Sequence, residues 1–264
     1  MSLGDAADRL SRLDPRLAFR AGQPSGAGWI PLAEAADPRV LERWIGARAR
    51  AANVATARVA LHLAARVVRP LMALLHLENC LPVATAERFF VHRDGASFDA
   101  LAIDADAYEP ARLPRVADQL CQVFTPIYQG LRRSGRYGLG PMWGGLLDMV
   151  GATSMLVARI GDVSRSDTWH QVETLNGLIE ERIRPVRPKR PRCVPVALSA
   201  GQHEPFTVKG TCCLKYRETG LRVGQLTDTT AYCKTCPHIP DGVRQDRCRP
   251  GIVRDLERHH IAVS

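Results

Sequence analysis

Four cysteines near the C-terminus of this 264-residue chain have a spacing that could bind a metal. Cys212 and Cys213 are adjacent, nineteen residues follow, and Cys233 and Cys236 then form a C-x2-C pair. Four thiolates can hold a tetrahedral zinc ion, a [2Fe–2S] cluster or a [4Fe–4S] cluster. Clustered cysteines in a reducing compartment are typical of metal or redox sites rather than of structural disulfides.

The adjacent pair favours an iron–sulfur cluster over zinc. Neighbouring side chains of an extended segment point to opposite faces, so Cys212 and Cys213 converge only where the backbone bends. The two irons of a cluster can accept ligands from more diverse directions than a single ion. Zinc, and ordinary buried thiols without any metal, remain the alternatives at this point.

Other cysteines and histidines could extend or replace this ligand set. Cys248 follows Cys236 by twelve positions, and we expect it to be a spare surface thiol. Cys193 is isolated, and Cys80 and Cys121 lie among apolar residues, which is typical of small core side chains. A Rieske-type centre uses two histidines, but with four cysteines present we expect solvated histidines at three positions: His238, His259 and His260.

Two hexapeptides around these cysteines resemble a known family. Thr211-Cys212-Cys213-Leu214-Lys215-Tyr216 and Tyr232-Cys233-Lys234-Thr235-Cys236-Pro237 are similar to the C-terminal signature of the FhuF-type ferric-siderophore reductases. Gly140-Pro141-Met142-Trp143 is similar to a mid-chain segment of that family. The gap between the two cysteine pairs is longer than the family usually shows, and a hairpin over residues 218–226 would absorb the excess.

The resemblance implies both a cofactor and an activity. It implies that Cys212, Cys213, Cys233 and Cys236 hold a [2Fe–2S] cluster. It also implies one-electron reduction of an Fe(III)-siderophore, with release of Fe(II) in the cytoplasm and no catalytic residue beyond the cluster. Hard oxygen ligands hold Fe³⁺ more tightly than Fe²⁺, so reduction releases the metal. The electron would come from an external ferredoxin, flavodoxin or flavin/NAD(P)H reductase.

The net charge of +9 is concentrated in one segment. Residues 182–192 hold six Arg or Lys side chains and no acid. We interpret this segment as a solvated linker, which leaves docking of an acidic electron donor or an anionic chelate open. The alternative function is a zinc-stabilised nucleic-acid-binding or interaction protein that uses this segment, although we regard nucleic acid as the less favoured partner because the basic residues are almost all Arg.

Hydrophobic periodicity predicts a mainly α, α+β fold. We expect helices over residues 31–47, 53–76, 111–133, 141–160 and 166–183, with a β-hairpin at 88–104 that turns at Asp94-Gly95. Pro70 should kink or divide the second helix, and Ser166 or Asp167 should cap the fifth. At helical spacing four aromatic residues should be core: Tyr128, Tyr137, Trp143 and Trp169.

The proline content divides the chain into three parts. Residues 1–183 form a helical, siderophore-binding body, 184–195 a Pro/Arg-rich linker, and 196–264 a Cys-rich module with short strands at 206–208 and 214–217 and a helix at 253–260. The first twenty residues carry three Asp and no apolar stretch, so we expect no secretory signal and a cytoplasmic location. We expect no membrane span, which leaves peripheral membrane association open.

Overall fold

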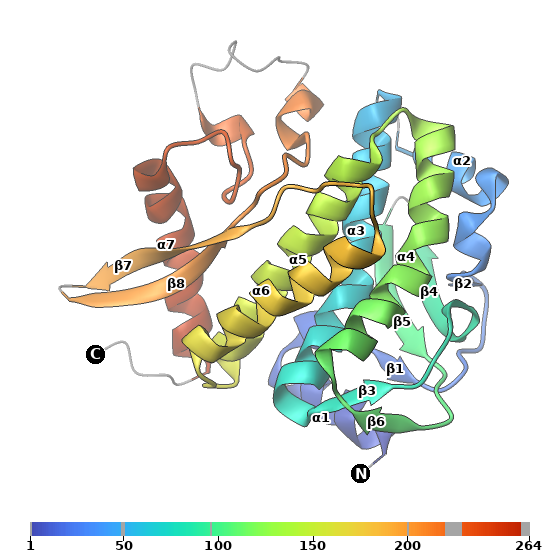
Figure 1. Cartoon of the computed structure of the whole chain (residues 1–264), viewed down its shortest axis with the longest axis horizontal. Helices are drawn as coiled ribbons and strands as arrows, with labels where there is room; N and C mark the ends of the chain where they lie inside the picture. Colours follow the sequence, from blue (N-terminus) through green and yellow to red (C-terminus); the bar gives the residue numbers. More distant parts are fainter. Residues whose placement is uncertain (1, 49–50, 96, 200, 220–228, 260–264) are drawn as a thin grey trace.

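The computed structural model describes residues 2–48, 51–95, 97–199, 201–219 and 229–259. The fold is α+β and mainly α, as predicted (Figure 1). A helical body with short sheets occupies one side of the molecule, and the β7–β8 hairpin and helix α7 lie along the other side.

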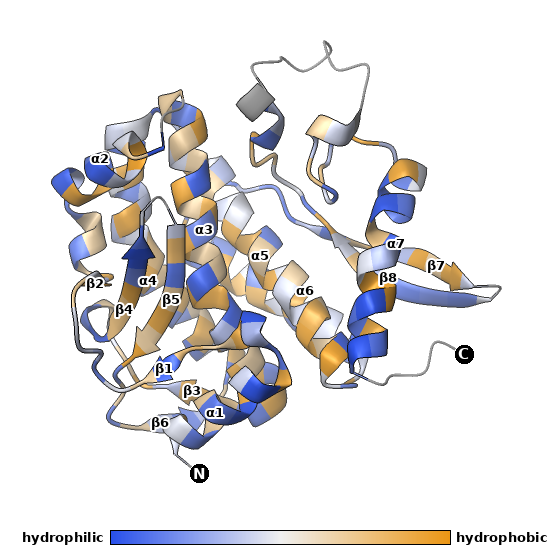
Figure 2. Ribbon diagram, turned by 180° about the vertical axis from the view of Figure 1, so that it is seen from behind, coloured by the Kyte–Doolittle hydropathy of each residue, from blue (hydrophilic) through white to orange (hydrophobic). Residues whose placement is uncertain are grey.

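Four long helices form the centre of the body. They are α3 (Ala52–Ala73), α4 (Leu113–Gly135), α5 (Leu139–Ile160) and α6 (Arg165–Arg182), and α5 packs against both α3 and α6. Figure 2 shows α5 as mostly hydrophobic, which fits its central place, whereas α7 carries many hydrophilic residues. The apolar spacing of these helices correctly predicted their existence, because each buries one continuous apolar face.

The ends of the helices correct two details of the prediction. Helix α3 continues through Pro70 and ends in a π-helical turn at Leu74–Glu78, so the proline does not divide it. Ser164, rather than Ser166 or Asp167, caps α6, because its hydroxyl accepts the N–H of Asp167. The helix Ala52–Glu78 is long and apolar enough to cross a membrane, and 61% of its most apolar window is buried in the fold.

Short strands cover the N-terminal part of the body. The strands β1 (Arg20–Ala21), β5 (Ser97–Ile103), β4 (Phe89–Asp94) and β2 (Trp29–Pro31) pair in that order. The predicted hairpin is β4–β5, and Gly95 adopts a positive φ of 54° at its turn. Strand β3 (Cys80–Pro82) pairs with β6 (Tyr108–Pro110), and two further helices complete the body: α1 (Leu3–Leu13) and α2 (Pro38–Gly46).

The C-terminal region has more regular structure than predicted. Strand β7 (Arg192–Ser199) begins inside the expected linker and pairs with β8 (Gln202–Val208). The strand expected at 214–217 is instead part of a 3-10 turn, Lys215–Thr219. Helix α7 runs over Asp241–Arg258, far longer than the expected 253–260. Cys248, Ile252 and Leu256 recur every four residues and bury one face against Val196 of β7, which explains the longer helix.

The C-terminal region has small hydrophobic cores of its own, and ion pairs connect it to the helical body. The main core extends to Ile183, whereas residues 196–256 form two small clusters of their own. The guanidinium of Arg159 on α5, only 4% exposed, lies 3.2 Å from the carboxylate of Glu204 on β8. Arg16 similarly bonds Asp255 of α7 at 2.8 Å. The cysteine region is therefore held against the body at several points.

Candidate metal centre

The structure brings the four predicted cysteines together. The Cys213 Sγ atom lies 3.7 Å from the Cys233 Sγ atom. Thiol hydrogen bonds also link Cys233 to Cys236 and Cys236 to Cys212. The C-x2-C turn is closed by the Cys236 N–H, which donates to the Cys233 carbonyl oxygen at 3.0 Å. The four sulfurs therefore form one continuous group.

The adjacent cysteines converge because the backbone bends beside them. Leu214, which follows the pair, adopts a left-handed φ of 57°. The preceding residues, Gly210 and Thr211, donate their N–H groups to the buried carboxylate of Asp148 on α5, at 2.7 and 3.1 Å. The Tyr137 hydroxyl donates to the Cys212 carbonyl oxygen at 3.1 Å. The helical body thus fixes the turn that carries the pair.

The site is poised to hold thiolates. A hydrogen bond from Cys236 lowers the pKa of Cys212 to about 6. Hydrogen bonds from Cys213 and Cys236 lower the pKa of Cys233. The bond to Cys233 and burial raise the pKa of Cys213, and the bonds to Cys212 and Cys233 with burial raise that of Cys236. Hydrogen bonds from neighbouring S–H groups thus favour the thiolate form of Cys212 and Cys233.

Two ionisable side chains from outside the four cysteines, the buried Asp148 and the half-buried Lys209, lie beside this group. Burial raises the pKa of Asp148 to about 7, although its bonds from Gly210 and Thr211 and the charge of Lys209 act in the opposite direction. Burial disfavours the charged form of Lys209, but Cys213 and the neighbouring anionic groups raise its pKa overall. A cation beside four sulfurs offsets part of their negative charge. The sequence signal for Asp148 was an acid inside the otherwise apolar helix α5.

The donor set fits an iron–sulfur cluster. Two sulfurs bound at about 2.3 Å to one tetrahedral metal lie about 3.8 Å apart, close to the observed separation of Cys213 and Cys233. Among the described residues no group of three or more His, Cys, Asp and Glu side chains is already arranged to hold a metal ion. Hydrogen bonds join the four sulfurs in the order Cys213, Cys233, Cys236 and Cys212, so each sulfur lies beside at least one other.

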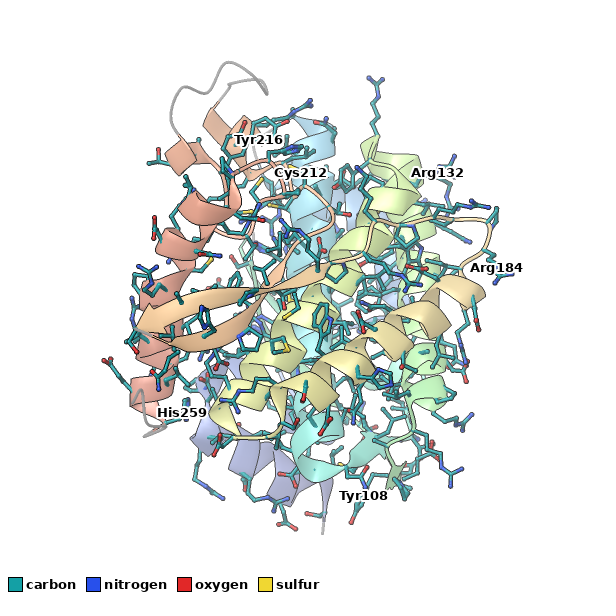
Figure 3. All side chains as sticks on the ribbon, turned by 60° about the vertical axis from the view of Figure 1, so that its left-hand side comes forward. Tyr108, Arg132, Arg184, Cys212, Tyr216 and His259 are labelled. Carbon is teal, nitrogen blue, oxygen red and sulfur yellow. The ribbon has the colours of Figure 1, made fainter. Side chains whose placement is uncertain are left out.

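The other candidate ligands differ in their distance from the four sulfurs: His238 lines the same pocket as Cys212, whereas Cys248 and His259 contact other groups. Cys248 is only 3% exposed, so the expectation of a surface thiol was wrong, and burial raises its pKa to about 11. Its Sγ atom lies 3.7 Å from the Lys234 carbonyl oxygen. The expectation of a solvated His259 was also wrong, because its side chain is only 8% exposed. It lies 3.5 Å from Asp14, at the opposite end of the region from Cys212 (Figure 3). His260 and most of the expected 218–226 hairpin lie outside the described residues.

The remaining sequence candidates divide between the core and the site. Tyr128 and Trp143 are buried and stack edge to face, while Trp169 packs against the core, as predicted. Cys80 and Cys121 are also buried in the main core, and Cys193 is half-buried on β7. Tyr137 also packs against the main core, and in addition it lines a pocket beside the cysteines and its hydroxyl bonds the Cys212 carbonyl oxygen.

An open pocket of about 510 Å³ adjoins Cys212. Three segments form its wall: the start of α5, the expected linker and the cysteine turn. The lining residues include Tyr137, Pro141, Arg187, Lys189, Cys212, Leu214 and His238. Its volume lies within the range of about 300–1,000 Å³ that is typical of small-molecule sites. The structure thus places a cavity of ligand size directly against one of the four sulfurs.

Comparisons with family models and curated proteins found no match. The similarity to the FhuF-type reductases therefore rests on the cysteine motif and on the short segment at the start of α5.

Proposed function

We propose that this protein is a [2Fe–2S] ferric-siderophore reductase. One observation carries the proposal: four cysteines from two distant segments converge into one group, and Cys212 of that group lines an open pocket. The pocket gives a chelate access to the redox centre, and the sulfurs supply the ligands that a cluster needs.

The chain's own residues have distinct roles in this proposal. The four cysteines would hold the cluster, while Asp148 and Tyr137 fix the turn that carries Cys212 and Cys213. When bound, a [2Fe–2S] cluster supplies one electron at a time at low potential. One electron from an external donor thereby converts chelated Fe³⁺ to Fe²⁺, and no group of the chain must transfer a proton. A cytoplasmic location, which keeps the thiols reduced, belongs to the same proposal.

Stopped-flow reoxidation tests this function. The protein is reduced anaerobically and mixed with a panel of ferric siderophores, and recovery of the oxidised visible spectrum is followed. We expect at least one siderophore to reoxidise it stoichiometrically with formation of Fe²⁺. Cys248→Ser is the control, since this thiol contacts the Lys234 carbonyl oxygen and is not one of the four proposed ligands, so its variant should still be reoxidised.

Two outcomes would count against the function. A protein that carries stoichiometric zinc and no colour would support the alternative interaction module. A coloured, reducible protein that no ferric siderophore reoxidises, but that other acceptors do, would be an electron carrier with a different partner.

A further inference from the structure

The six cations of residues 182–192 fall into two groups. Three of them form ion pairs at 2.6 Å: Arg182 with Asp118, Arg190 with Glu180, and Arg192 with Asp241. The other three, Arg184, Arg187 and Lys189, are exposed and form no ion pair with any residue that the structure describes. The paired cations connect elements of the fold. Arg184, Arg187 and Lys189 form no such connection, so their charges are available to a ligand.

Two of these unpaired cations face the cysteine site. Arg187 and Lys189 line the pocket that adjoins Cys212, and His238 lines it from the segment after Cys236. No carboxylate is among the described residues that line this pocket. Apolar surface completes the wall, from residues such as Tyr137, Pro141 and Leu214. The pocket thus combines positive charge with apolar contact area.

Packing holds the cationic segment in place. Val186 packs against the main core, and Pro191 is buried. The Arg190 backbone runs so close to Gly210 that any side chain at position 210 would overlap the Arg190 carbonyl oxygen. The segment is therefore a fixed wall beside the cysteine turn rather than a freely solvated linker, so its charges keep their place relative to Cys212.

We propose that this pocket binds the ferric chelate and selects chelates that carry net negative charge, such as catecholate or hydroxycarboxylate complexes, over neutral trihydroxamates. This inference rests on the proposed reductase function and adds a substrate class to it. Two cations without a carboxylate beside them favour an anion, while the sulfur ligand at Cys212 in the same wall offsets part of their charge. The field within a cavity is screened less than on a flat surface.

Binding of redox-inert Ga³⁺ complexes tests the inference without any electron transfer. The cluster-containing full-length protein is titrated calorimetrically with a trianionic Ga³⁺ tricatecholate and with a neutral Ga³⁺ trihydroxamate. The pocket variant is Arg187→Glu/Lys189→Glu. The matched control, Arg132→Glu/Arg133→Glu, makes the same charge change at exposed residues of α4 that do not line the pocket (Figure 3 labels Arg132).

We expect the wild type to bind the trianion at least tenfold more tightly than the neutral complex. The pocket variant should lose this preference, with anion affinity reduced about tenfold or more, which corresponds to about 1.4 kcal/mol. The control should stay within about twofold of the wild type for both complexes. Arg187→Gln/Lys189→Gln, which avoids new negative charge, should show an intermediate loss, and far-ultraviolet circular dichroism checks that each variant folds.

The outcomes separate this inference from the proposed function. Equal binding of the two complexes by the wild type, or an unchanged anion affinity in the pocket variant, would overturn the inference. So would a variant that binds the trianion normally but accepts electrons more slowly from an acidic ferredoxin, since the cations would then serve the donor. Normal, charge-dependent binding together with no reoxidation by any ferric chelate would refute the reductase function instead.

Discussion

Replacing Gly144 by Ala should disrupt the contact between α5 and the cysteine turn. A Cβ atom at this position would overlap the Thr211 hydroxyl oxygen, and it would lie 3.1 Å from the Thr211 Cβ and 3.3 Å from the Lys189 carbonyl oxygen. Overpacking of this kind costs about 1–3 kcal/mol, because neighbours must leave their preferred positions. Thr211 immediately precedes the cysteine pair, so the displacement would reach the proposed ligands directly.

The next residue along the helix supplies the matched control. A Cβ atom at Gly145 would meet no atom within 4 Å, so Gly145→Ala adds helix propensity alone and should stabilise the fold by about 0.5–1 kcal/mol. Gly144→Ala gains the same propensity and adds the overlap. The difference between the two variants in free energy of unfolding should therefore be about 1–3 kcal/mol.

Urea unfolding of the metal-free, reduced chain measures this difference. Thr211→Ala removes the overlapping oxygen, so the Gly144→Ala/Thr211→Ala double variant should recover about 1–2 kcal/mol relative to additivity. Iron uptake during anaerobic reconstitution should fall in Gly144→Ala and not in Gly145→Ala. Equal stability of the two single variants, or no recovery in the double variant, would refute the packing described for this turn.

Two further predictions concern charges elsewhere in the fold. Burial lowers the pKa of His76 to about 4, so the folded chain keeps it neutral and stability falls as pH decreases from about 6.5 towards 4. Between pH 7 and pH 5 the wild type should lose about 2 kcal/mol more than His76→Gln in urea unfolding, and parallel losses would contradict the assignment. Glu204→Gln leaves the buried guanidinium of Arg159 without its nearest carboxylate and should cost about 3 kcal/mol. Asp118→Asn, which breaks an exposed ion pair, should cost less than about 1 kcal/mol in the same assay, and a similar cost for both would argue against that difference in burial.

The elements that follow a simple local rule could be predicted from the sequence. The long body helices each bury one apolar face, and Asp94-Gly95 between apolar runs marks the β4–β5 hairpin. The two cysteine pairs could be identified as one site because their residue types and spacing are unusual in a soluble chain. Cys80 and Cys121 could be assigned to the core from their apolar neighbours alone.

Features that depend on tertiary contacts could not be predicted in this way. The end of the proline-rich segment forms strand β7 because β8 pairs with it and α7 packs against it. Helix α7 continues through Pro250 because its apolar face is buried. Tyr137 has the spacing of a core residue, and only the path of the cysteine turn places its hydroxyl against Cys212. Asp148 likewise gains its role from two backbone N–H groups more than sixty residues away.

Iron and acid-labile sulfide analysis of the anaerobically purified chain, combined with electron paramagnetic resonance after one-electron reduction, tests the central claim most directly. We predict about two irons and two sulfides per chain with the paramagnetic signal of a reduced [2Fe–2S] cluster. Ser at position 212, 213, 233 or 236 should abolish or alter this signal, whereas Cys248→Ser should preserve it. A colourless protein with one zinc per chain, or a cluster that survives removal of Cys233, would contradict the assignment of these four cysteines.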